Sequence, residues 1–93
     1  MRSVMKRYVR CRVSPGLFNT EFYVSIPNSS AYVSSQNVKV RQQPEPGRDV
    51  EGEVVAYMID EGHGRDEVLI ELTGEPVVGG LRTWIPKRLL VGA

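Results

Sequence analysis

Residues 6–14 read Lys-Arg-Tyr-Val-Arg-Cys-Arg-Val-Ser, and their alternation decides the fold. In an extended strand successive side chains point to opposite faces, so the two valines and Cys11 share one face while Arg10 and Arg12 share the other. We therefore predict a strand whose apolar face lies against the core and whose arginines face water.

The rest of the chain has the same character. No long stretch has apolar residues at helical spacing, and clusters of glycine, proline or serine recur about every 8 to 12 residues, as in β-sandwiches and barrels. Further strands are predicted at residues 21–26, 31–41, 52–59, 67–72 and 81–91. The segment 31–41 is broken near Gln36, and the segment 81–91 is interrupted by Pro86. Residues 52–59 are apolar on both faces, which indicates a central strand covered on both sides.

Length and composition indicate one domain with a small core. The chain has 93 residues, of which 41% are hydrophobic and 25% charged, and folding at this length leaves much of the surface exposed. A loop with two prolines, residues 44–47, separates N-terminal strands in residues 6–43 from a second portion in residues 46–91. Either half alone approaches the lower size limit of a stable domain, so we predict a single all-β domain over residues 1–93.

The net charge of +1 hides an uneven distribution. Residues 1–43 carry seven basic side chains against Glu21 alone, a net +6, whereas residues 44–93 carry five basic and ten acidic side chains, a net −5. Such asymmetry is typical of a nucleic-acid surface, and equally of two halves that attract each other.

The sequence also indicates a compartment. No run of about 18 apolar residues exists, and the first residues lack the apolar stretch of a secretory signal. A single cysteine, Cys11, permits no intramolecular disulfide. We therefore expect a cytoplasmic protein without a membrane partner.

The second portion resembles a known class of small barrel. Gly47, residues 52–57 and residues 68–72 are similar to the glycine-led strand, hairpin and returning strand of SH3-like small barrels of bacterial and translation-associated proteins. Residues 84–91 resemble their closure, in which a strand ends at a proline-containing turn and a brief final strand seals the barrel. The resemblance implies a small SH3-like barrel, here extended by an N-terminal β-hairpin, and an OB-fold is the structural alternative.

Catalytic chemistry finds no support in the sequence. The only histidine, His63, lies in a charged loop without metal-ligand spacing, and there is neither a Gly-x-Ser-x-Gly elbow nor a phosphate-binding loop. Cys11 is in phase with buried valines, so we predict a buried thiol and not a nucleophile. We expect no enzyme, no cofactor and no metal site.

A basic face is the main candidate site. If the first and third predicted strands are neighbours, cationic and aromatic side chains gather on one surface that neutralises phosphates and stacks bases. These residues are Tyr8, Arg10, Arg12, Tyr23, Lys39 and Arg41. The competing interpretation is that the cations pair across strands with Glu51, Glu53, Glu67 or Glu71, and charge balance favours it.

Trp84 is the remaining candidate. It shares a strand face with Arg82, opposite Thr83 and Ile85, and is either an anchor for a protein partner or a cover for the barrel end. We therefore predict a non-enzymatic protein-interaction module or accessory subunit that binds through a strand edge or loop face. The alternative is a nucleic-acid-binding module that uses the basic face; the identity of the ligand and the oligomeric state stay open.

Overall fold

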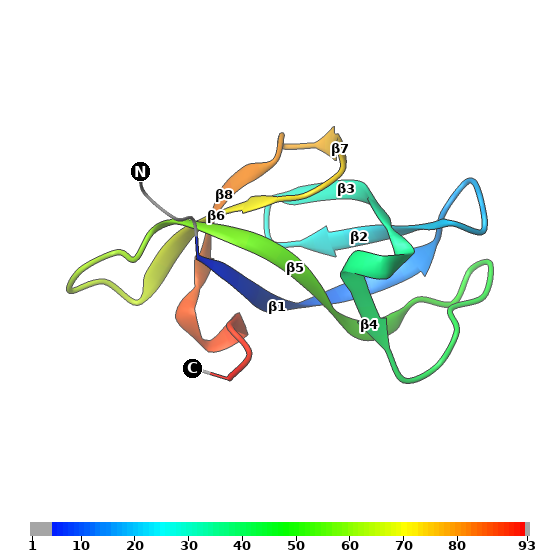
Figure 1. Cartoon of the computed structure of the whole chain (residues 1–93), viewed down its shortest axis with the longest axis horizontal. Helices are drawn as coiled ribbons and strands as arrows, with labels where there is room; N and C mark the ends of the chain where they lie inside the picture. Colours follow the sequence, from blue (N-terminus) through cyan, green and yellow to red (C-terminus); the bar gives the residue numbers. More distant parts are fainter. Residues whose placement is uncertain (1–4, 93) are drawn as a thin grey trace.

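The computed structural model of the chain describes residues 5–92, so residues 1–4, with the Arg2 of the basic half, and residue 93 lie outside the described part. The described residues form a strongly curled antiparallel sheet (Figure 1). Its strands are β1 (Lys6–Pro15), β2 (Glu21–Ile26), β3 (Ser29–Ser34), β4 (Val38–Val40), β5 (Val50–Asp60), β6 (Glu67–Leu72), β7 (Glu75–Val78) and β8 (Arg82–Pro86). The predicted all-β, barrel-like fold is confirmed.

The sheet is organised around the long strand β5. The strand order is β7-β3-β2-β1-β5-β6-β8, and β4 also pairs with β5. One edge of β5 pairs with β1, from Val13 opposite Val50 to Lys6 opposite Tyr57, while its other edge pairs first with β4 and then with β6. The predicted central position of this strand is confirmed, and the barrel draws on β1 as well as on residues 46–91.

The alternation predicted for β1 is confirmed. Val9 and Val13 are fully buried and Cys11 is 7% exposed, whereas Arg10 and Arg12 are exposed. The core continues this inner face with small β-branched side chains from neighbouring strands, a composition that suits a pleated sheet. Its other hydrophobic members are Val24, Ile26, Ala31, Val33, Val38, Val54, Ala56, Val68, Ile70, Leu72, Ile85 and Leu90.

The prediction that β5 is covered on both faces is wrong. Val54 and Ala56 on its inner face are buried, but Val55 and Tyr57 on the outer face are only half-buried. The reason is that the sheet curls around a single core, so within residues 5–92 no second layer covers its outer side. The apolar residues of the outer face are tolerated because an isolated exposed hydrophobic side chain costs little.

The turn after β2 is shorter than predicted. Residues 27–30 were expected to form a turn, but only Pro27 and Asn28 do so, and Asn28 adopts the left-handed conformation (φ 64°) of a tight hairpin. Ser29 and Ser30 belong to β3 and are buried. The break near Gln36 is confirmed as a 3-10 helix, η1 (Ser35–Asn37), between β3 and β4.

The C-terminal segment completes the edge of β1. Of the residues of β1, only residues 12–15 pair with β2. After β8 the chain makes a 3-10 helix, η2 (Lys87–Leu89), and then Leu90 forms an antiparallel bridge with Val9 while the Val91 N–H donates to the Tyr8 carbonyl over 2.9 Å. The C-terminal segment therefore pairs with β1, the strand that also carries Arg10 and Arg12.

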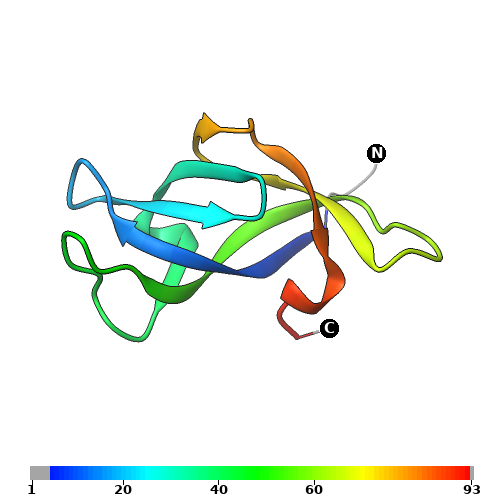
Figure 2. The ribbon, with the colours of Figure 1, turned by 180° about the vertical axis from the view of Figure 1, so that it is seen from behind.

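The loops gather at opposite ends of the molecule. The β1–β2 and β4–β5 loops protrude together at one end, and the β5–β6 hairpin protrudes at the other (Figures 1 and 2). Within residues 5–92, no helix is long and apolar enough to cross a membrane.

Candidate functional site

The predicted basic face exists in part, on the outer side of the sheet. Strand β5 separates β1 from β4, so these strands are not neighbours, and Arg10, Glu53 and Lys39 are aligned in register across the three. Arg12 lies opposite Glu51 in the same ladder. Each cation of these two rows therefore faces a carboxylate on β5, as the interpretation of cross-strand pairing requires.

Arg12 is the most firmly paired of these cations. Its guanidinium lies 2.8 Å from the Asp49 carboxylate and 3.8 Å from that of Glu51. The hydrogen bond from Arg12 lowers the pKa of Asp49, and the same bond raises the pKa of Arg12. All three groups are at the surface, so the pair fixes side-chain position more than it stabilises the fold.

The tyrosines of the proposed stacking surface are already engaged and lie apart. The Lys39 ammonium lies 4.2 Å from the centre of the Tyr8 ring. Tyr23 is opposite Ser14, further along the β1 strand, where its hydroxyl donates to Ser30 over 2.8 Å. Its ring centre is 5.4 Å from that of Tyr32. The aromatic and cationic residues therefore do not interleave into one platform for bases.

The remaining predicted residues lie elsewhere. Arg41 follows β4 in an exposed loop. Trp84 is half-buried on the outer face of β8, opposite Leu69, and the Arg65 guanidinium lies 5.3 Å from its ring centre. His63 is exposed, and no group of three or more potential metal-ligating side chains occurs among residues 5–92.

Cys11 has the environment of a structural thiol. Burial raises its pKa from 9.0 to about 12, with a smaller contribution from the negative charge of Glu53. The thiolate is the reactive form of cysteine, so a pKa this high keeps the thiol unreactive near neutral pH. The prediction that it is buried is confirmed.

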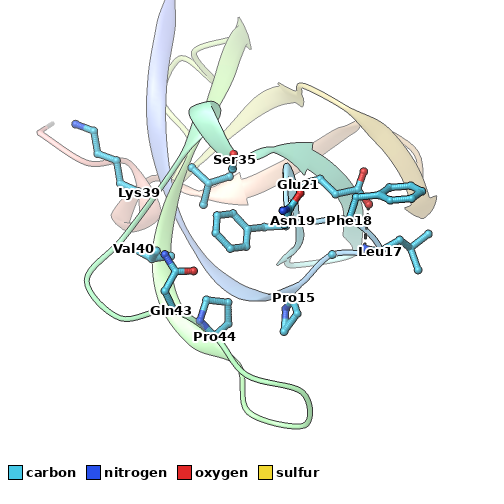
Figure 3. Close-up of a pocket in the computed structure, with 13 residues that line it drawn as sticks. Pro15, Leu17, Phe18, Asn19, Glu21, Ser35, Lys39, Val40, Gln43 and Pro44 are labelled. Atoms are coloured by element: carbon cyan, nitrogen blue, oxygen red, sulfur yellow. Dashed lines mark hydrogen bonds between the residues drawn. The ribbon is translucent and has the colours of Figure 1, made fainter.

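A groove that the sequence did not predict lies at the loop end of the molecule (Figure 3). It has a volume of about 800 Å³ and lies between the β1–β2 loop on one side and β4 with the following loop on the other. Its lining consists of Pro15, Gly16, Leu17, Phe18, Asn19, Glu21, Phe22, Ser35, Val38, Lys39, Val40, Gln43 and Pro44. Leu17 and Phe18 are 72% and 69% exposed, the highest values among the exposed large hydrophobic residues in the described part of the chain.

The loop that carries these two residues is held in place by hydrogen bonds. The Leu17 N–H donates to the Glu21 carboxylate over 3.1 Å, and the Glu21 N–H donates to the Phe18 carbonyl over 3.3 Å. A Cβ atom at Gly16 would lie 2.5 Å from the Glu21 carbonyl oxygen, so only glycine fits this turn. Leu17 and Phe18 are thus presented to solvent by a defined turn. We call Leu17, Phe18 and the groove the loop-end surface.

One signal in the sequence marks this surface. Leu17 and Phe18 interrupt a polar turn between Gly16 and Asn19, and two consecutive large apolar residues in a turn are unusual because turns face water. The groove itself has no such signal, since β4 and the loop after it come to lie opposite the β1–β2 loop only in the folded sheet.

No protein-family model, curated protein or solved structure matches this chain. The resemblance of residues 46–91 to SH3-like barrels therefore stays a prediction.

Proposed function

We propose that this protein is a non-enzymatic protein-interaction module that binds its partner through the loop-end surface. The observation that carries the proposal is the exposure of Leu17 and Phe18 beside a groove that can receive a segment of another chain. Covering a large apolar side chain contributes about 1.5–3 kcal/mol, which makes such a pair an effective anchor.

The geometry of the turn supports the same proposal. A binding loop that is already ordered loses less conformational entropy when the partner docks. The hydrogen bonds between Glu21 and the Leu17–Phe18 segment supply this order. Loops that project from a rigid sheet are also where binding residues concentrate in proteins.

The nucleic-acid alternative is weaker because of the carboxylates of β5. Glu51 and Glu53 lie among the cations of the basic face, where their negative charges oppose the attraction of these cations for a phosphate backbone. We expect no saturable binding of labelled single-stranded oligonucleotides at low salt, measured by fluorescence anisotropy. A Glu51→Gln, Glu53→Gln double variant should gain salt-sensitive binding. Salt-sensitive binding by the unaltered protein would favour the alternative.

A capture experiment tests the proposed function. The protein is immobilised and exposed to a lysate of its source organism, and the partner identified is then purified and titrated against variants. Leu17→Asp, Phe18→Asp should weaken partner binding at least about tenfold, because two charged groups would have to be buried.

The matched control is Val77→Asp, Val78→Asp, which changes two exposed valines of β7 (50% and 58% exposed) in the same way. Circular dichroism and urea unfolding confirm that both variants fold. The proposal is wrong if the β7 variant loses the partner while the Leu17, Phe18 variant keeps it.

A further inference from the structure

Resting on the proposed function, we infer that the partner contributes an extended, apolar segment that pairs with the free edge of β4 and lies in the groove as an added strand. Strand β4 has one neighbour in the sheet, β5, so its second edge pairs with no other strand of residues 5–92. An unpaired strand edge presents backbone N–H and C=O groups that another extended chain can bind.

Two contacts show which backbone groups lie on this edge. The Val38 N–H donates to the Ser35 carbonyl, away from β5. The Lys39 carbonyl oxygen lies toward β5, where a Cβ atom at Gly52 would be only 2.7 Å from it. In an antiparallel ladder the backbone groups of successive residues point alternately toward and away from the neighbouring strand. Val40 therefore directs its N–H and C=O away from β5, and among the described residues neither group meets a backbone partner on that side.

This edge borders the groove. All three residues of β4 line the groove, although alternation sends the side chain of Lys39 to the opposite face from those of Val38 and Val40. In Figure 3 the Lys39 side chain projects away from the groove. Lys39 therefore lines the groove with its backbone, so the open edge of β4 forms part of this wall.

The two end strands of the sheet are less suited to accept a further strand. Strand β7 carries Pro76, which has no N–H, and its pairing with β3 is irregular. Prolines and bulges are features that keep sheet edges from pairing. Strand β8 ends at Pro86, and its Thr83 hydroxyl donates to the Pro27 carbonyl, so the β2–β3 turn lies against it. Strand β4 contains neither a proline nor a register shift.

The lining sets the side chains of the segment. Every second side chain of the added strand would face inward, among apolar residues of the groove. These are Pro15, Phe22, Val38 and Val40. The two charged lining residues are engaged elsewhere, because Lys39 projects away and Glu21 already accepts the Leu17 N–H over 3.1 Å. An inward-facing side chain of the segment is therefore apolar, since a charged one would lose its hydration without gaining a partner.

The segment belongs to a different protein and not to the β4 of a second copy. Two β4 strands paired along all three residues would bring their central residues, both Lys39, opposite each other. Like charges in that position destabilise a sheet. Glu53 attracts each lysine from β5, on the other side. It lies one strand further from the lysine of the second copy, so the repulsion between the two lysines is the stronger effect.

Hydrogen exchange of the backbone amides, followed by NMR, tests the inference. The probe is a synthetic peptide whose sequence is enriched from a phage-displayed library of short random peptides on the immobilised protein. In the free protein the Val40 amide should exchange rapidly, while the Lys39 amide, which faces β5, should exchange slowly. Saturating peptide should slow the exchange of Val40 at least about tenfold and leave that of Lys39 unchanged.

Removal of single N–H groups gives the second readout, by fluorescence anisotropy with labelled peptide. Methylation of one backbone nitrogen of the peptide should weaken binding about tenfold at every second position, where the N–H faces β4, and less at the positions between. Val40→Pro removes the donor on the protein side and should weaken binding about as much. The matched control is Val77→Pro, which makes the same change in the irregular part of β7. Circular dichroism and urea unfolding check that both variants fold.

The outcomes distinguish this inference from the proposed function. If peptide binding requires Leu17 and Phe18 but leaves the exchange of Val40 fast, the inference is wrong and the proposed surface stands. If the peptide binds the Leu17→Asp, Phe18→Asp variant and the Val40→Pro variant unchanged, both are wrong. A library that yields no binding peptide overturns the inference, and the capture experiment then decides the proposed function alone. Slow exchange of Val40 without peptide also overturns it: a dimer in sedimentation would show a second copy on the edge, and a monomer an edge closed within the chain.

Discussion

At the scale of single residues, Cys11 makes the stability of the fold depend on pH in the alkaline range. Its pKa in the folded chain is about 12, against 9.0 ordinarily, because burial disfavours the thiolate. Below pH 9 both folded and unfolded chains keep the proton. Between pH 9 and 12 only the unfolded chain releases it, so the folded state loses stability as the pH rises.

Comparison with Cys11→Ala isolates this effect from other groups that titrate at high pH. The variant is less stable at pH 7, because a buried side chain is shortened. We expect the free energy of unfolding of the unaltered protein, relative to that of Cys11→Ala, to fall by about 3 kcal/mol by pH 11, measured by urea unfolding. A difference that stays constant with pH would show that the thiol ionises equally in both states.

At the scale of the element, Trp84 belongs to the packing of the β5–β6 hairpin. Its ring lies beside Arg65 of the hairpin loop, and a Cβ at Gly62 would lie 3.5 Å from it. The β5–β6 hairpin is at the opposite end of the molecule from the β1–β2 loop, which carries Leu17 and Phe18 (Figures 1 and 2). The geometry thus favours the interpretation that Trp84 covers the end of the barrel over the interpretation that it anchors a protein partner.

We therefore expect Trp84→Ala to lower the free energy of unfolding by about 2 kcal/mol, less than for a fully buried tryptophan, because this ring is half-buried. Hydrogen exchange should become faster in residues 61–66, while binding of the captured partner stays unchanged. Lost partner binding with unaltered stability would instead identify Trp84 as an anchor.

At the scale of the whole molecule, stability depends on the closure at β1. Leu90 is 8% exposed and bridges Val9, at a position of β1 that β2 does not reach. Leu90→Ala should lower the free energy of unfolding by about 3 kcal/mol, as for other large-to-small core changes. It should also accelerate exchange of the Val91 amide, which donates to Tyr8. Arg88→Ala, a change at an exposed residue of the same segment, should neither lower the free energy of unfolding nor accelerate this exchange. Rapid exchange of the Val91 amide in the unaltered protein would contradict the pairing of the C-terminal segment with β1.

Local pattern was enough to predict the all-β fold and most strand positions. Alternation places Val9, Cys11 and Val13 inward, and it predicts β2 and β6 with the bounds they have. Strand β5 shows the limit of prediction from local pattern. Its apolar outer face predicts a second covering layer, but a pattern along one strand does not reveal whether such a layer exists.

The sequence by itself therefore determined the strands, the inner and outer faces, the buried thiol and the outward arginines, because each depends on side-chain alternation within a few residues. Only the tertiary structure decided that β5 lies between β1 and β4, so that Glu53 stands between Arg10 and Lys39. The groove beside Leu17 and Phe18 likewise depends on the tertiary structure. Strand order and sheet curl arise from contacts between distant residues, which no local pattern encodes.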